Sequence, residues 1–348
     1  MKMLLIGPSD AFAREWINRL GKEGHTVGLV AMTDFLPLEK PALSYHWFGY
    51  PADSPRLDKG WASFKPDRVV FAGQLFGDAE WDIEPSTVAY LGELVNCLHL
   101  AAKYQASQFI YLSSTEVYPP LSLDSASKSA YLESDPLAPV TVKGLLCQQG
   151  EHLAQEFCRI HDLDLTLLRY AEIGGYGLDS VRNDVISSLA RQLLSLPEVT
   201  VNIAQTYHLL PMGDAVDAVV RAVTSGRHGI YNVASARTTQ AQDLSAMIKK
   251  QVGSTSTLVR ESNSPAHYPA DVTAIKRELE WVELRSFSDL LPQWVQTATA
   301  PNPLKRHRLQ RIRASSPVGQ SIQTGLLFQR IFRTESHQQQ QRHDQAPV

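Results

Sequence analysis

The stretch Phe109-Ile110-Tyr111-Leu112-Ser113-Ser114-Thr115-Glu116-Val117-Tyr118 decides the fold class of this 348-residue chain. Its first half, residues 109–113, is a short apolar run that ends in small residues, as buried strands do. A similar run covers residues 68–72, and the sequence between them predicts an amphipathic helix over residues 87–104. Strand–helix–strand units of this length pair their strands in parallel. The sequence therefore predicts an α/β fold with a parallel sheet.

The same alternation extends over the first 170 residues and becomes less regular after residue 171. Ligands of such sheets bind beyond the carboxyl ends of the strands, so we expect any site there. Further strands are predicted at residues 3–6, 26–32, 165–168 and 229–233. Further helices are predicted at residues 11–20, 140–160, 181–195 and 239–250, and another helix is predicted to begin at residue 212.

The composition is that of an ordinary globular protein, with 43% hydrophobic and 20% charged residues and a net charge of −3. No apolar run approaches the roughly 18 residues that span a bilayer. The first seven residues lack the features of a signal peptide. The three cysteines, Cys97, Cys147 and Cys158, do not have metal-ligand spacing. We therefore expect a cytoplasmic protein without disulfides, a membrane span or a bound metal.

Residues 301–348 differ from the rest of the chain. They carry eight Lys or Arg residues against Glu335 and Asp344, a net charge of +6. Their polar end predicts partial disorder. A short helix with an apolar side around Ile322 to Phe332 is the alternative, and it would suit a protein partner or an anionic surface. The basic residues are too few and too dispersed to indicate nucleic-acid binding.

Several segments together resemble the NAD-dependent epimerase/dehydratase family of extended short-chain dehydrogenases/reductases. Their order and spacing carry the resemblance, which extends from residue 1 to about residue 300. The matching segments are the opening strand with Gly7, residues 66–73, residues 109–118, the strand ending at Arg169, residues 212–217, residues 229–233 and residues 271–281.

The resemblance implies a Rossmann-like doubly wound sheet and a division into parts. Residues 1–170 with 205–235 would form the NAD(P)-binding-type domain. Residues 171–204 with 236–300 would form a smaller substrate-type lobe, followed by the basic tail. Family members commonly dimerise through two helices that correspond to residues 87–104 and 140–160. We therefore expect a homodimer.

The resemblance also implies an NAD or NADP site, but the dinucleotide turn departs from the family pattern. That turn needs three small residues, and the matching positions are Gly7, Asp10 and Ala13. Asp10 brings a negative charge to a helix N-terminus that should receive phosphate. Its carboxylate can cap the helix and occupy the anion site itself. The positions that would contact the cofactor are Gly7, Asp10, Phe12, Ala72, Gly73 and Ser113.

Two other cofactor contacts of the family are altered. The acidic residue that binds ribose is absent near Ala31, where the second strand ends, although Asp34 could substitute. At the position where the family has an Asn that contacts the cofactor, this chain has Ala89. We therefore predict that NAD or NADP binding is weak or absent.

The catalytic pair of the family is missing. Its reactions use a Tyr with a Lys four residues later, and a nearby Ser or Thr. None of the twelve Tyr residues here has a Lys at that spacing, whereas Ser114 matches the Ser or Thr. Glu151 and Arg169 resemble the helix Glu and strand Arg of the family. When the chain is aligned with the family pattern through these two residues, Lys143 falls at the Tyr position and Cys147 at the Lys position.

In the alternative register, with Lys143 as the catalytic Lys, the Tyr position falls on Pro139. Either way, Lys143 and Cys147 share a helix face, and the ammonium could lower the thiol pKa and create a nucleophile. The simpler interpretation is a packed Cys147 and a solvated Lys143. Tyr118 or Tyr170 could instead act as an acid beside Lys143.

Other polar residues near the expected site have simpler interpretations. We expect Glu116 and Glu172 to be solvated at the mouth of the pocket. Arg169 either ties its strand to the sheet or faces an anionic ligand.

This pattern allows two interpretations of the function. In the first, which Ser114 favours, the chain is a divergent family member that acts on or binds a nucleotide-sugar-like small molecule. Alternatively, it is a non-catalytic scaffold or binding protein that uses its cleft and basic tail to contact a partner. The changes at both the cofactor and the catalytic positions favour the second interpretation.

Overall fold

The computed structural model describes residues 1–8, 10–30, 45–49, 52–73, 83–121, 129–174, 185–262 and 268–299. The basic tail at 301–348 lies outside these residues, as do Ala31, where the acidic residue is absent, and its possible substitute Asp34. The side chain of Asp10 also lies outside the described part, although its backbone is included.

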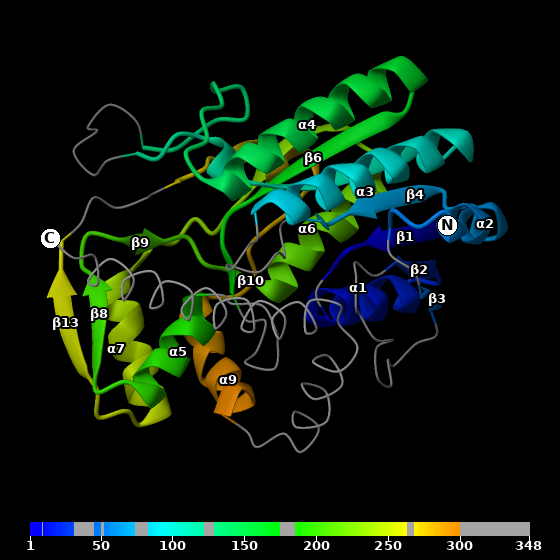
Figure 1. The fold of residues 1–348 in the computed structure, drawn as a ribbon. Helices are drawn as coiled ribbons and strands as arrows, with labels where there is room; N and C mark the ends of the chain where they lie inside the picture. The colour runs from blue at the N-terminus through cyan, green and yellow to red at the C-terminus, as the bar shows by residue number, and fades with distance from the viewer. Residues whose placement is uncertain are drawn as a thin grey trace, which may run out of the picture. The chain divides into compact units, whose positions relative to one another are not determined.

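A seven-stranded parallel sheet forms the centre of the described residues (Figure 1). The strand order is β11-β6-β5-β4-β1-β2-β3. From β1 the chain builds outward first on one side and then on the other, which is the doubly wound arrangement. The predicted Rossmann-like fold is confirmed. The strands are β1 (Lys2–Ile6), β2 (Thr26–Val30), β3 (His46–Phe48), β4 (Arg68–Phe71), β5 (Gln108–Ser114), β6 (Asp164–Tyr170) and β11 (Gly229–Val233).

Helices cover both faces of this sheet. Helices α1 (Asp10–Lys22) and α6 (Met212–Ser225) pack on one face. Helices α2 (Arg56–Phe64), α3 (Ile83–Lys103) and α4 (Val142–His161) pack on the other. Helix α2 was not predicted from the sequence.

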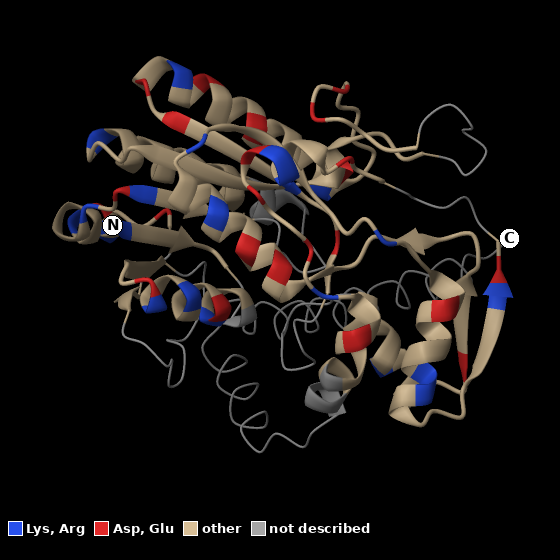
Figure 2. Ribbon diagram, turned by 180° about the vertical axis from the view of Figure 1, so that it is seen from behind, with Lys and Arg blue, Asp and Glu red and all other residues tan. Residues whose placement is uncertain are grey.

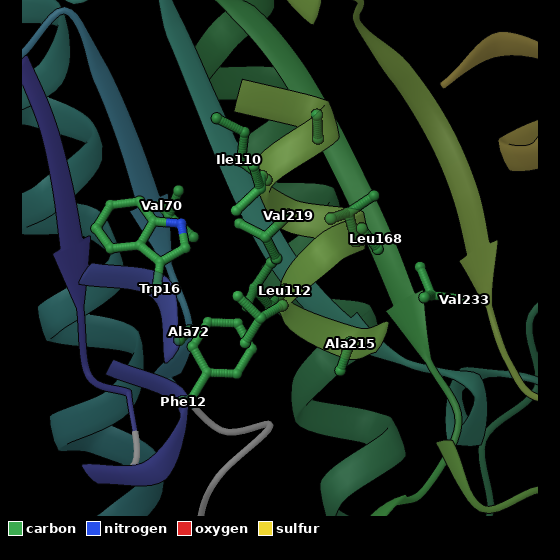
Figure 3. Packing of buried hydrophobic residues seen from close by; sticks show 14 of the residues in the cluster. Phe12, Trp16, Val70, Ala72, Ile110, Leu112, Leu168, Ala215, Val219 and Val233 are labelled. Atoms are coloured by element: carbon green, nitrogen blue, oxygen red, sulfur yellow. The ribbon is translucent and has the colours of Figure 1, made fainter. Parts of the chain in front are cut away.

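Successive strand residues point to opposite faces, so each strand contributes to both hydrophobic layers. In β1, Met3 and Leu5 join the layer under α1, whereas Leu4 and Ile6 join the other. Figure 3 shows the first layer, where Phe12 and Trp16 lie against side chains from neighbouring strands and from α6. Full burial of such side chains contributes roughly 1.5–3 kcal/mol each.

The region after residue 171 contains a separate hydrophobic cluster. It joins α5 (Val185–Ser195), α7 (Ala241–Val252) and α9 (Phe287–Thr299) around side chains such as Leu244 and Leu291. The division into two lobes stays a prediction. The other elements are η2 (Thr115–Val117), β7 (Ile173–Gly174), β8 (Glu198–Asn202), β9 (Thr206–Tyr207), β10 (Leu210–Pro211), β12 (Thr239–Gln240), β13 (Thr257–Glu261) and α8 (Thr273–Glu278).

Charged residues of both signs are spread over these elements (Figure 2). Within the described ranges, we find no helix that combines the length and the apolar character of a membrane span.

One buried carboxyl on α3 has a raised pKa. Glu93 on α3 is 3% exposed, and its Oε2 atom has no hydrogen-bond partner among the described residues. Burial, together with the charge of Asp53, raises the pKa of Glu93 to about 8. The carboxyl is therefore mostly protonated at neutral pH.

This shift makes stability depend on pH. Because the Glu93 pKa is higher in the folded protein than its ordinary value of 4.5, the unfolded chain loses the proton first as pH rises. The free energy of unfolding should therefore fall between about pH 4.5 and pH 8. We expect Glu93→Gln to stabilise the protein by about 1–3 kcal/mol at pH 8. Urea denaturation should show little effect at pH 5, and an equal effect at both pH values would contradict the assignment.

Candidate functional site

A group of buried polar residues gathers at the carboxyl ends of three neighbouring strands. Ser113 on β5 pairs in register with Arg169 on β6, which pairs with Asn232 on β11. All three side chains are buried. Parallel sheets bind their ligands at this edge.

Arg169 and Glu151 form a buried ion pair between β6 and α4. Arg169 Nη2 lies 2.7 Å from Glu151 Oε2 and Arg169 Nε lies 3.0 Å from Glu151 Oε1, while the two side chains are 3% and 1% exposed. Ser113 Oγ donates to Glu151 Oε1 at 2.5 Å. Burial alone would lower the pKa of Arg169, but the contact with Glu151 raises it above its ordinary value. Arg169 therefore has a structural role, although it ties its strand to helix α4 rather than to the sheet, as one of the two interpretations had it.

Tyr118 belongs to the same network. Its hydroxyl accepts from Arg169 Nη1 at 2.8 Å and donates to Asn232 Oδ1 at 2.8 Å. Its ring stacks on Tyr131, with the ring centroids 4.7 Å apart. Burial raises the pKa of Tyr118 to about 12 despite the nearby Arg169 charge. A phenol held in this way is a poor acid at neutral pH, so the geometry does not support the candidate role of Tyr118 as a catalytic acid.

Lys143 and Glu116 form an ion pair at the start of α4. Lys143 Nζ donates to Glu116 Oε1 at 2.7 Å, and Thr141 Oγ1 donates to Glu116 Oε2 at 2.7 Å. Burial alone would raise the pKa of Glu116 and lower that of Lys143, but their attraction reverses both shifts. We expected solvated side chains at Lys143 and Glu116. Both are partly exposed, at 38% and 24%, and they are also paired with each other, because the fold brings η2 against the first turn of α4.

Cys147 is a packed side chain. It is 0% exposed and lies in a small cluster with Val117, Tyr118 and Tyr131. Burial raises the pKa of Cys147 to about 12, and the Lys143 charge offsets only part of this shift. The thiolate is the nucleophilic form of cysteine. The environment therefore disfavours the nucleophile hypothesis for Cys147.

Ser114 and Tyr170 are also engaged within the protein. Ser114 caps η2, with its Oγ accepting from the Glu116 backbone N–H at 3.2 Å. Its hydroxyl retains a hydrogen to donate, so a role in orienting a ligand stays a prediction. The Tyr170 hydroxyl donates to the Ala215 carbonyl oxygen at 2.8 Å, toward α6. Tyr170 is therefore directed into the core rather than toward Lys143.

The turn after β1 begins at Gly7. Gly7 has a φ of 71°, a left-handed conformation that favours glycine, and its N–H donates to the Val30 carbonyl oxygen at 3.0 Å. This turn leads into the N-terminus of α1, beside the point where the strand order reverses between β1 and β4. Pyrophosphate binding at this turn, and its weakening by the negative charge of Asp10, stay predictions.

Phe12 and Gly73 have clear packing roles. The Phe12 side chain is fully buried in the layer of Figure 3, so a part in cofactor binding would fall to its backbone. A Cβ on Gly73 would approach ring atoms of Phe71 and Tyr90 to 2.4 and 2.6 Å. Packing therefore requires glycine at this position, whether or not a cofactor binds. Ala72 is likewise buried, and its N–H donates to the Ile6 carbonyl oxygen at 2.8 Å.

In the part of the chain that the structure describes, no group of three or more His, Cys, Asp or Glu residues is placed to hold a metal ion. Cys97, Cys147 and Cys158 are free, buried thiols.

The sequence model of the NAD dependent epimerase/dehydratase family matches residues 14–234. The chain belongs to this family. No curated protein matches the chain.

Solved structures of similar fold are consistent with this membership. UDP-glucose 4-epimerase from Thermotoga maritima, with UDP-glucose, has a TM-score of 0.70 at 17% identity, covering 85% of this chain and 98% of that one. dTDP-glucose 4,6-dehydratase from Bacillus anthracis, with NAD, has a TM-score of 0.70 at 16% identity, covering 85% and 96%. The Bordetella bronchiseptica enzyme WbmG, with NAD and UDP, has a TM-score of 0.68 at 17% identity, covering 85% and 93%. At these identities the likeness shows the shared fold.

Three residues of this network, Asn232, Tyr131 and Glu133, were not found from the sequence. Asn232 accepts from Tyr118 and donates its Nδ2 hydrogen to the Tyr131 carbonyl oxygen at 3.0 Å. The Asn232 backbone N–H donates to Glu133 Oε1 at 2.9 Å. The only signal was the place of Asn232 in a strand near the carboxyl edge of the sheet.

The ion pair of Arg169 can be tested by removing its partner. We expect Glu151→Gln to lower the free energy of unfolding by about 3–5 kcal/mol, because the guanidinium would stay buried without a counter-charge. Glu156→Gln is the matched control, since Glu156 pairs with Arg159 on the same helix but both side chains are more than 60% exposed, at 67% and 69%. That control should change stability by less than about 1 kcal/mol in urea denaturation. Equal effects of the two substitutions would contradict the role of the buried pair.

Proposed function

We propose that this family member binds a nucleotide-sugar-like molecule at the carboxyl edge of its sheet and lacks the proton transfer of a phenol–ammonium pair. One observation carries this proposal: Lys143, at the position of the family's Tyr, is ion-paired with Glu116, 2.7 Å away. Cys147, at the position of the family's Lys, is a buried thiol.

The register behind this assignment is supported by contacts. It rests on Glu151 and Arg169, and these two side chains form the buried ion pair. A helix face repeats every three to four residues, so fixing Glu151 toward the sheet also orients Cys147 and Lys143 toward the same side. Neither residue has the chemistry of the missing pair, because an ammonium held by a carboxylate is a poor proton donor.

A nucleotide-sugar ligand is supported by family membership and by the similar solved structures, one of which holds UDP-glucose. The apolar side chains exposed on α3 and α4 support the predicted homodimer, since a partner copy would cover them. They are Val88, Val95, Val142, Leu145, Leu153 and Ile160. A role of the tail in docking a protein partner stays a prediction for residues outside the described part.

The absence of the usual proton transfer can be measured directly. Incubation with UDP-glucose or dTDP-glucose and NAD should leave the sugar unchanged, because Lys143 is paired with Glu116 and Cys147 is a buried thiol. Proton NMR of the nucleotide-sugar would detect a 4-epimer or a 4-keto-6-deoxy product. Formation of either product at rates proportional to protein concentration would overturn the proposal.

The charge of Asp10 should weaken cofactor binding. Two negative charges about 4 Å apart repel by roughly 1–4 kcal/mol, which corresponds to about one to three decades of affinity. We expect Asp10→Gly to tighten NAD or NADP binding by at least about tenfold in isothermal titration. Asp10→Asn separates charge from size, because it removes the charge and keeps the side chain. Micromolar affinity of the unaltered protein would contradict the expected weak binding.

A further inference from the structure

Glu93 on α3 is a buried carboxyl that no other described group neutralises. It is 3% exposed, and its Oε2 atom has no hydrogen-bond partner within the described residues. No described Lys or Arg forms an ion pair with it. A buried carboxylate that lacks both water and a counter-charge is strongly unfavourable. Glu93 can therefore stay buried only while it holds a proton.

The titratable groups nearest to Glu93 do not supply the missing positive charge. Asp53, an exposed residue before α2, adds a second negative charge. Tyr90 and Cys97 lie one turn away from Glu93 on either side along α3, and the Tyr90 hydroxyl is bonded to that of Tyr111 on β5. Burial raises the pKa of Tyr90, Cys97 and Tyr111 well above their ordinary values, so all three are neutral.

The charged groups on the other elements around α3 are paired elsewhere. On α4, Glu151 is bonded to Arg169. On α2, Asp58 Oδ1 accepts from Lys103 Nζ at 2.7 Å and from the Tyr104 hydroxyl at 2.9 Å, and these bonds hold α2 to the C-terminal end of α3. Neither group leaves a positive charge for the buried carboxyl.

The opposite end of the contact between α2 and α3 holds two carboxyl groups. Asn96 Nδ2 donates to the Ala52 carbonyl oxygen at 2.6 Å. Asn96 is one turn after Glu93 on α3, and Asp53 directly follows Ala52. This hydrogen bond therefore brings Asp53 close to the face of α3 that holds Glu93, about 15 Å along the helix from Lys103.

Apolar side chains fill the contact between these two ends. Ala52 and Trp61 belong to the same hydrophobic cluster as Leu94 of α3. Hydrophobic contacts carry no charge that changes with pH. Residues 52–64 are thus held on α3 by contacts that weaken at one end when Glu93 ionises.

We propose that Glu93 and Asp53 form a proton switch, in which the proton on Glu93 keeps residues 52–64 packed on α3 and its loss lets this segment detach. Water then reaches the carboxylate, while Asp58 stays bonded at the other end. The central sheet remains folded, so this opening differs from global unfolding. Residues 52–55 follow β3 at the carboxyl edge of the sheet, and this part of the edge becomes mobile as pH rises. The inference is independent of the proposed function.

The direction of the pH effect follows from the two states. The Glu93 pKa is about 8 in the closed state and returns toward its ordinary value of 4.5 when the segment opens. Between these values the open state binds fewer protons, so its population rises by up to about tenfold for each pH unit. We expect an increase of about 10- to 50-fold from pH 6 to pH 8.

Amide hydrogen exchange followed by mass spectrometry tests the switch at pH 6 and pH 8, with rates corrected for the intrinsic pH dependence of exchange. Residues 56–64 should be less protected than β5 at both pH values, because their opening is local. Their protection should fall by about 10- to 50-fold from pH 6 to pH 8. Glu93→Gln keeps the size of the side chain but cannot ionise, so it should abolish this fall.

Asp53→Asn is a second variant, at an exposed position that tolerates substitution. It should make the pH-dependent fall smaller, because only burial then opposes the ionisation of Glu93. An unchanged fall would overturn the role of the pair.

Asp58→Asn is the matched control, since it removes an acidic group at the other end of the same contact. The contact with Lys103 lowers the pKa of Asp58 below its ordinary value, so this carboxylate is charged at both pH values. The substitution should lower the protection of residues 56–64 by the same factor at pH 6 and pH 8.

Three results would overturn the switch. The first is protection of residues 56–64 that does not change with pH in the unaltered protein. The second is an equal pH dependence in Glu93→Gln. The third is equal protection of residues 56–64 and β5, which would show that exchange requires global unfolding. None of these measurements uses a nucleotide-sugar, so the proposed function stands or fails separately.

Discussion

The buried ion pair between Arg169 and Glu151 is the interaction on which the site depends. Removing two charges from water costs several kcal/mol for each ion, and this cost is offset only where geometry and hydrogen bonds are good. Here the pair has close contacts at 2.7 and 3.0 Å, and Ser113 and Tyr118 complete it. Because each partner alone would be a buried, unpaired charge, helix α4 and strand β6 are held in one relative position.

This constraint determines what the first turn of α4 can do. Gly144 lies so close to η2 that a Cβ there would come within 2.2 Å of the Glu116 carbonyl oxygen. The close approach lets Glu116 reach Lys143 and Thr141 together. Lys143 is therefore used for ion pairing, and Cys147 is packed among Val117, Tyr118 and Tyr131. The Lys143 side chain is still 38% exposed, which is compatible with ligand recognition without proton transfer.

The fold was largely predictable, because it depends on local patterns. The apolar runs at residues 109–113 and 68–72 formed strands β5 and β4, and the predicted helices began and ended within four residues of their expected bounds where both ends are described. Helix α2 was missed, although Leu57, Trp61 and Phe64 have helical spacing and are buried.

The site was less predictable, because it depends on contacts between distant residues. Glu116 and Lys143 are 27 positions apart, and Tyr118 and Asn232 are 114 positions apart. No periodic pattern indicates that such residues meet, and pKa shifts that arise from burial cannot be inferred before the layers are known. Glu151 and Arg169 were singled out only because they resembled positions of a known family, and their pairing was not predicted.

The central claim is that the chain keeps a ligand-binding family fold while Lys143 serves an ion pair instead of proton transfer. A crystal structure of the protein soaked with NAD and UDP-glucose tests it most directly. The account predicts that Lys143 stays within about 3 Å of Glu116, as charge-assisted hydrogen bonds require, with no phenol placed for proton transfer to the ligand. A nicotinamide ring bound beside a tyrosine hydroxyl that contacts both Lys143 and the reacting sugar carbon's oxygen would contradict it.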